Sequence, residues 1–209
     1  MLFDTTFKKA LQQLSNPEKD KLILRLLRHN LDLANKLHFE LVDTETVEDK
    51  REKLENRIVE RMQSASKRYY SAGYLLMDVR WLSGEITEHV SITKDKLGEI
   101  SLNCLMLQQL LLLNNSRIAA ETPGNAHTLC IYIVARIFKI SILLQKHHED
   151  MHIEFKKDIE KIGKLVSNNK NVIKVAIMNG LDVNWLIQFN IPNNIAGIYK
   201  SLREKGFLR

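Results

Sequence analysis

The sequence contains few of the residues that interrupt helices. Its 209 residues include three prolines and eight glycines, the two residue types that tight turns use most. This scarcity argues against a sandwich or barrel with many turns and favours long helices. No segment shows a clear alternation of apolar and polar residues, which would mark a strand. The β-branched run 131–134 has the composition of a buried strand, but a helical pattern passes through it.

Cysteine and long uncharged apolar runs are also scarce. Cys104 and Cys130 lie in separate apolar stretches without CxxC spacing, so we expect two buried free thiols. The most apolar stretch, residues 129–144, carries Arg136 and Lys139 and falls short of the ~20 residues of a membrane span. The N-terminal stretch lacks the apolar core of a signal peptide. We therefore expect a cytoplasmic protein with no membrane-spanning helix.

Charge of one sign is not strongly in excess. The formal net charge is +6, with 27% charged and 44% hydrophobic residues, which is ordinary for a globular protein. The excess lies towards the two ends of the chain and is mild in each. Nucleic-acid-binding modules usually concentrate positive charge more than this, so a solvated surface with a modest positive bias explains the composition.

Helical periodicity, in contrast, is abundant. Residues 125–167 contain no proline and one glycine, and one set of mostly apolar positions recurs there at intervals of three or four residues. That spacing is close to the ~3.6 residues per turn of an α-helix. We therefore predict an all-α, multi-helix bundle packed around one long central helix, about 125–167.

Shorter helical segments precede and follow this stretch. Three of them fill the first 42 residues, and Ser15 and Glu18 have the spacing of a capping box with Pro17 in the first turn. Further short helices follow residue 167, so we expect helical hairpins at both ends. The simplest domain organisation is one helical domain, 1–209; an N-terminal helical subdomain, 1–70, is the alternative.

One short motif has a sharp chemical interpretation. His148, Glu149 and His152 form a literal HExxH on a predicted helix. Histidines at i and i+4 share a helix face and can hold one metal ion, while the glutamate activates a bound water. The motif resembles that of zinc metalloproteases. No histidine follows His152 to complete a ligand set, and zinc or iron held between facing helices is a gentler version of the same hypothesis. Solvated side chains at a helix edge are the simpler interpretation.

A second motif combines cations with aromatic rings. Lys67, Arg68, Tyr69 and Tyr70 follow one another, and Tyr74 comes shortly after. Cations hold phosphates and aromatic rings stack on bases, so this patch is a candidate contact for single-stranded RNA or DNA. The alternative is structural: basic residues favour a helix C-terminus, and tyrosines pack at the rim of a core.

Taken together, these patterns favour an interaction function over catalysis. The sequence contains no P-loop, GxGxxG or GxSxG motif. The leading hypothesis is a non-enzymatic helical interaction or scaffold protein that binds another protein or a second copy of itself. The first alternative is a metal-binding helical protein that uses the HExxH at 148–152, and a zinc-dependent hydrolase is one version of this alternative. The second alternative is an RNA- or DNA-binding helical protein.

Overall fold

The structure is a computed structural model that describes residues 3–208. Within that range it contains eleven helices and no strand, which confirms the predicted all-α, multi-helix fold. The chain divides into two compact units. One comprises the residues up to Glu45 together with Ser91–Thr93, and the other comprises Thr46–Val90 and the chain from Lys94 onward. The single domain 1–209, with its alternative subdomain 1–70, stays a prediction.

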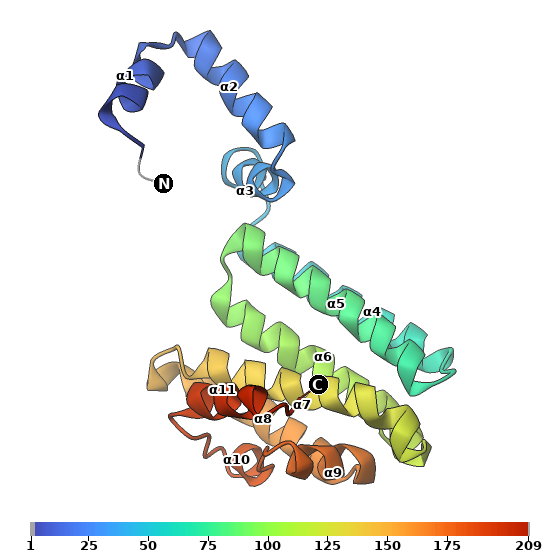
Figure 1. The fold of residues 1–209 in the computed structure, drawn as a ribbon. Helices are drawn as coiled ribbons and strands as arrows, with labels where there is room; N and C mark the ends of the chain where they lie inside the picture. Colours follow the sequence, from blue (N-terminus) through green and yellow to red (C-terminus); the bar gives the residue numbers. More distant parts are fainter. Residues whose placement is uncertain (1–2, 209) are drawn as a thin grey trace. The chain divides into compact units, whose positions relative to one another are not determined.

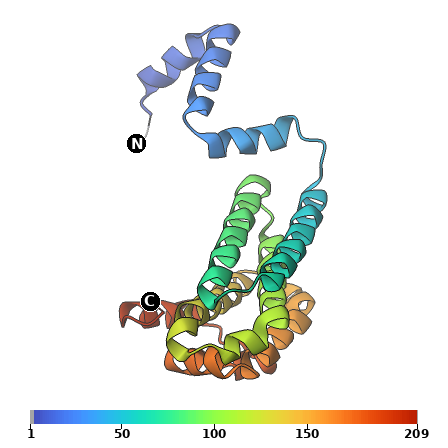
Figure 2. The ribbon, with the colours of Figure 1, turned by 90° about the vertical axis from the view of Figure 1, so that its right-hand side faces the viewer.

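The first unit contains three short helices, α1 (Thr5–Gln13), α2 (Asn16–Arg28) and α3 (Leu31–Leu41). Figure 2 shows them as separate rods joined by short turns. Each begins at a capping side chain: Asp4 for α1, Ser15 with Glu18 for α2, and Asn30 for α3. The Glu18 carboxylate accepts the Ser15 N–H at 2.9 Å, which confirms the predicted capping box. None of the three helices contains a buried residue, so local signals rather than a core define them.

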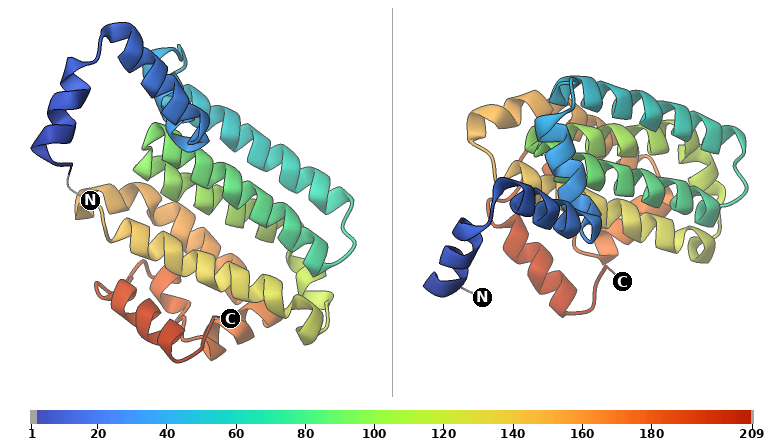
Figure 3. Two further views of the ribbon diagram at one scale, coloured as in Figure 1. Left: turned by 45° about the horizontal axis from the view of Figure 1, so that its top comes forward. Right: turned by 90° about the horizontal axis from the view of Figure 1, so that it is seen from above.

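The second unit contains the remaining helices, except for the last three residues of α5. They are (Figure 1) α4 (Val47–Lys67), α5 (Ala72–Thr93), α6 (Lys96–Ala120), α7 (Pro123–Leu144), α8 (Glu149–Ser167), α9 (Lys170–Met178), α10 (Asn184–Ile187) and α11 (Ile195–Glu204). A short turn joins α4 to α5, which runs back along it (Figure 3). Arg61 on α4 pairs with Asp78 on α5 at 2.6 Å, so charge as well as packing links the two helices.

The centre of this unit is α6. It has twelve buried residues, more than any other helix in residues 3–208, and packs against α4, α7, α8 and α9. The core therefore lies around residues 96–120, and the predicted central position of residues 125–167 is wrong. α6 and α7 are both rich in apolar residues, so the number of neighbours that each helix acquires decided which of them is central.

The predicted single helix over 125–167 is also wrong, because it is two helices. α7 ends at Leu144, residues 145–148 form a turn, and α8 begins at Glu149 with His148 as its extended N-cap residue. The turn lies in the polar run 145–150, and Glu149 and Asp150 supply the acidic first turn that a helix N-terminus favours. The apolar spacing continues across the break because Leu144 and Phe155 both face the core.

The C-terminal segment folds into short helices, as predicted. Asn169 begins α9 by accepting the backbone N–H groups of Asn171 and Val172, each at 3.1 Å. Gly180 follows α9 with φ +71°, the left-handed conformation that glycine adopts most easily. The chain then turns back through α10 and α11, and α11 packs on α7.

Helix α7 bears on the membrane prediction. It is 22 residues long and, by length and composition, apolar enough to cross a membrane; half of its most apolar stretch is buried inside the protein. The helix is thus longer than the apolar stretch 129–144, whose short length was the reason for expecting no membrane-spanning helix. Cytoplasmic location and the absence of a membrane segment stay predictions.

Candidate functional site

The two histidines of the HExxH motif do not share a helix. His148 is the residue before α8, with φ −60° and ψ 146°, and its Nδ1 accepts the Asp150 N–H at 3.4 Å. His152 lies within α8, and its Nε2 is 3.0 Å from the His147 carbonyl oxygen. Residues at i and i+4 share a face only when both are helical, and His148 is not, so the predicted pairing of the two histidines on one helix face is wrong.

Other potential ligands do not gather around these residues. In residues 3–208, no three His, Cys, Asp or Glu side chains are placed together so as to hold a metal ion. Glu149 and His152 do line a cavity of about 360 Å³, but their neighbours there include Gln145, Asn190 and Lys156. Side-chain amides and an ammonium group are poor ligands for a zinc or iron ion. Metal binding stays a prediction without geometric support.

The basic-aromatic motif is divided by the fold. Tyr69 is partly buried, and its hydroxyl donates a hydrogen bond to Glu121 Oε1 at 2.8 Å. The Arg117 guanidinium carbon lies over the Tyr69 ring, 5.3 Å from the ring centre. Burial, followed by the Glu121 hydrogen bond, raises the pKa of Tyr69 well above its ordinary value. Tyr69 is therefore a structural link between the α4–α5 turn and the end of α6.

The other members of this motif face solvent. Tyr70 is 79% exposed and packs edge to face against Tyr74, with ring centres 5.2 Å apart. Lys67 ends α4 and is exposed, while the Arg68 guanidinium donates to Ser64 Oγ at 3.1 Å. Arg68 and the two exposed tyrosines line a cavity of about 330 Å³. This arrangement offers rings for stacking beside cations.

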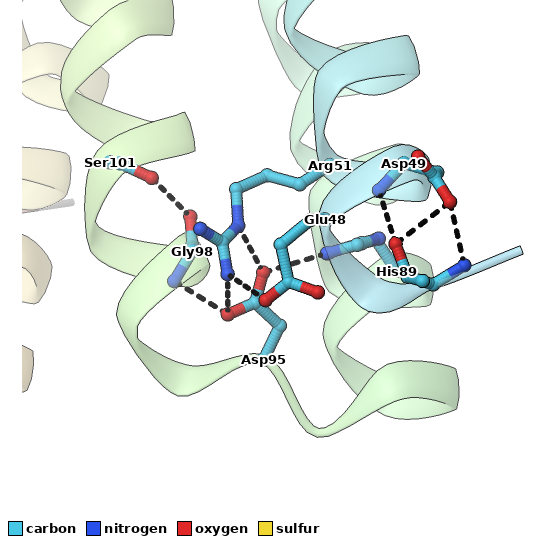
Figure 4. A network of polar contacts seen from close by, with 8 residues as sticks. Glu48, Asp49, Arg51, His89, Asp95, Gly98 and Ser101 are labelled. Atoms are coloured by element: carbon cyan, nitrogen blue, oxygen red, sulfur yellow. Dashed lines mark hydrogen bonds and ion pairs between the residues drawn. The ribbon is translucent and has the colours of Figure 1, made fainter.

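Asp95 is a polar centre that the sequence argument missed. It precedes α6 and accepts hydrogen bonds from Arg51 Nε of α4 at 2.6 Å and from the Gly98 N–H at 2.8 Å. His89 of α5 lies 3.1 Å away through Nε2 (Figure 4). In the sequence, Asp95 is visible only as an aspartate at the start of a helical pattern. Such a position predicts a helix cap, but it does not predict the partners of Asp95 on other helices. The cluster joins three helices and is structural in kind.

Exposed apolar side chains concentrate in the first unit. Of the nineteen large apolar residues that are exposed in residues 3–208, nine lie between Phe3 and Val42. On α2, Ile23, Leu24 and Leu26 are 48%, 58% and 56% exposed. Exposed apolar surface beyond a few scattered residues commonly marks an interaction site.

Charged residues flank Leu24 in a regular order. Asp20, Leu24 and Arg28 are spaced four residues apart, so they lie on one face of α2, with the acid one turn before the leucine and the base one turn after it. Asp20 and Arg28 are both exposed, and neither makes an ion pair within residues 3–208. We call the face formed by Asp20, Leu24 and Arg28 the α2 face.

Comparisons with known proteins add no family to this description. No protein-family model, curated protein or solved structure matches the chain.

Proposed function

We propose that this protein is a non-enzymatic helical scaffold that associates with a second copy of itself through the α2 face. The proposal commits to one partner, an identical chain, and to one geometry, an antiparallel α2–α2 pair. The observation that carries it is the order of Asp20, Leu24 and Arg28 on one exposed helix face.

The burial pattern supports association through this unit. Helices α1 to α3 contain no buried residue, although many of their side chains are apolar. Ordering a residue costs roughly 1–2 kcal/mol of conformational free energy, and burial of apolar area is the main term that offsets this cost. A contact through the α2 face would bury Leu24, which is 58% exposed, and so supply burial that the described chain does not provide.

The charge pattern favours an identical partner. Residues 3–45 contain seven basic and seven acidic residues, so two copies of this segment have no net repulsion. In an antiparallel pair centred on Leu24, Asp20 of each chain lies opposite Arg28 of the other. The two ion pairs and the central leucine contact then repeat by two-fold symmetry, as in an isologous dimer.

Charge exchange tests this geometry directly. Asp20→Arg places two arginines opposite each other at both ends of the pair, and Arg28→Asp does the same with two aspartates. We expect each single variant to lose self-association in a sedimentation-velocity concentration series. The double variant, Asp20→Arg with Arg28→Asp, regains it. An equimolar mixture of the two single variants also associates, because every opposing pair is again of opposite sign.

A matched pair of apolar substitutions controls for exposure. Leu24→Glu removes the central contact and should give a monomer, whereas Ile177→Glu alters a 69% exposed isoleucine on α9 and should leave association unchanged. A wild-type chain that stays monomeric over the whole concentration series overturns the proposal. Single variants that associate as strongly as the wild type refute the antiparallel geometry.

A second function, binding of single-stranded nucleic acid, is favoured by the exposed pair Tyr70 and Tyr74. Stacking of a base on an aromatic ring contributes ~1–3 kcal/mol, and Lys67 and Arg68 lie next to these rings in the sequence. We expect binding of an unstructured oligonucleotide to weaken steeply with salt, and the slope to flatten in the Lys67→Ala, Arg68→Ala variant. Tyr70→Ala should weaken binding without changing the slope. A salt-independent signal argues against this function.

A further inference from the structure

A cavity along α7 has no role in either proposed function. It has a volume of about 510 Å³ and is lined mainly by α7, with Thr87 of α5 and Tyr199 of α11 completing its walls. Small-molecule sites commonly have volumes of ~300–1,000 Å³. The cavity is therefore large enough for an organic ligand and small for a folded polymer segment.

The lining is basic. Arg136, Lys139 and Lys146 all contribute to it, and no acidic side chain does. Lys139 pairs with Glu99, which lies outside the lining, at 2.7 Å. Lys146 is exposed and makes no ion pair within residues 3–208. Two of the three positive charges in the cavity thus have no carboxylate partner.

Arg136 is positioned by neutral groups. Its Nη1 donates to Asn103 Oδ1 at 3.1 Å, and its Nη2 donates to the Tyr132 hydroxyl at 2.7 Å. Tyr132 is itself hydrogen-bonded to Ser83 on α5, and Asn103 is fully buried. These contacts fix the planar guanidinium while leaving its charge unpaired. A guanidinium of this kind matches the oxygens of a phosphate or carboxylate.

Spacing along α7 sets the arrangement of the ligand. Arg136 and Lys139 are three residues apart, which keeps them on one side of the helix, and Lys146 lies in the turn just after α7. Ile142 and Leu143 lie between the lysines and also line the cavity. An apolar wall thus separates the Arg136–Lys139 end from Lys146.

Tyr199 provides a further donor. Its ring packs against Phe138, with ring centres 5.4 Å apart, and its hydroxyl has no hydrogen-bond partner within residues 3–208. Because Tyr199 lines the cavity from α11, it faces the α7 cations across the site. A ligand oxygen would satisfy this hydroxyl.

We propose that this cavity binds a small phosphate monoester with an apolar or aromatic body. The phosphate is held by Arg136 and Lys139, the body lies along Ile142 and Leu143, and Lys146 adds positive charge at the far end. Phosphate monoesters include both free small molecules and the lipid phosphatidic acid, and a volume of about 510 Å³ favours the free molecule.

Titration calorimetry of the full chain with phenyl phosphate tests the proposal. We expect saturable binding, with phenol and inorganic phosphate each binding more weakly because each lacks one half of the recognised chemistry. Arg136→Gln, which removes the charge but keeps a side-chain amide donor, should weaken binding by about tenfold or more. Lys146→Ala, at an exposed position, should weaken it by about threefold.

Controls separate ligand binding from folding and from membrane attachment. Lys161→Ala removes an exposed lysine on α8, outside the cavity, and should leave affinity unchanged. If Arg136→Gln unfolds the protein by circular dichroism, Lys146→Ala decides the outcome alone. Absence of saturable phenyl phosphate binding, or equal affinity in the wild type and Lys146→Ala, overturns the proposal. Sedimentation with phosphatidic acid vesicles without binding of phenyl phosphate overturns it in favour of a lipid headgroup.

Discussion

At the scale of single residues, Asp95 and Tyr69 illustrate how burial assigns a role. Burial alone acts to raise the pKa of the Asp95 carboxyl. Hydrogen bonds from Arg51, His89 and the Gly98 N–H, together with the charge of Arg51, outweigh this effect and hold the pKa below its ordinary value. Tyr69 was predicted to face a nucleic acid, but Glu121 and Arg117 engage it instead. Neither outcome is visible in a sequence, because Arg51 is 44 residues from Asp95 and Glu121 is 52 residues from Tyr69.

The Asp95 cluster predicts a pH-dependent contribution to stability. Since its folded-state pKa is lowered, the ionised carboxylate stabilises the fold above the unfolded-state pKa of ~3.9, and this stabilisation is lost as pH falls through the lower, folded-state value. Asp95→Asn should therefore reduce the free energy of unfolding by about 3 kcal/mol near neutral pH. The difference from the wild type should shrink in the acidic range below pH ~4. Urea unfolding at several pH values measures it.

The control for this prediction is a more exposed ion pair. Arg57 and Glu85 link α4 to α5 with side-chain exposures of 56% and 20%. Glu85→Gln should cost less than about 1 kcal/mol, because solvent weakens exposed pairs. A difference between the wild type and Asp95→Asn that does not change with pH would contradict the assigned role of the carboxylate.

At the scale of helices, the contact between α8 and α10 depends on one glycine. A Cβ atom on Gly163 would lie 2.9 Å from Leu186 Cβ and 3.0 Å from the backbone nitrogen of Ile187. The absence of a side chain therefore lets the short α10 approach α8 closely. The sequence shows Gly163 only as a residue that weakens a helical pattern, whereas the structure shows that a side chain there would collide with α10.

Two glycine-to-alanine substitutions should have opposite effects. Gly163→Ala should lower the free energy of unfolding by ~1–3 kcal/mol, because overpacking outweighs the gain in helix propensity. Gly84→Ala, in α5 with no atom within 4 Å of the added Cβ, should raise it by up to ~1 kcal/mol. Thermal and urea unfolding compare the two. Stabilisation by Gly163→Ala would refute the close α8–α10 contact.

At the scale of the whole molecule, the two units differ in how they are stabilised. All the buried apolar residues of the range 3–208 lie at position 54 or beyond, so the core belongs to the second unit. The first unit consists of capped helices with exposed apolar faces. In the proposed scaffold, the second unit supplies stability and the first supplies the contact with another chain.

Deletion of residues 1–45 tests this division. We expect residues 46–209 to keep their helical circular dichroism and to unfold cooperatively, because none of the described residues 3–45 is buried. A peptide of residues 1–45 should be largely unfolded at low concentration, since isolated short helices are marginal in water. Loss of cooperative unfolding in the shortened chain would show that the first unit contributes to the core.

The sequence by itself determined that this protein is all-α, and it located the start of α2. Those properties depend on the spacing of apolar residues and on capping groups within a few positions of each other, such as Ser15 and Glu18. Only the tertiary structure decided that residues 125–167 are two helices, that α6 is central and that Arg136 lines a basic cavity. The physical reason is that burial, charge pairing and cavities arise from residues far apart in the chain, whereas an apolar stripe has the same period in one helix as in two that pack on the same core.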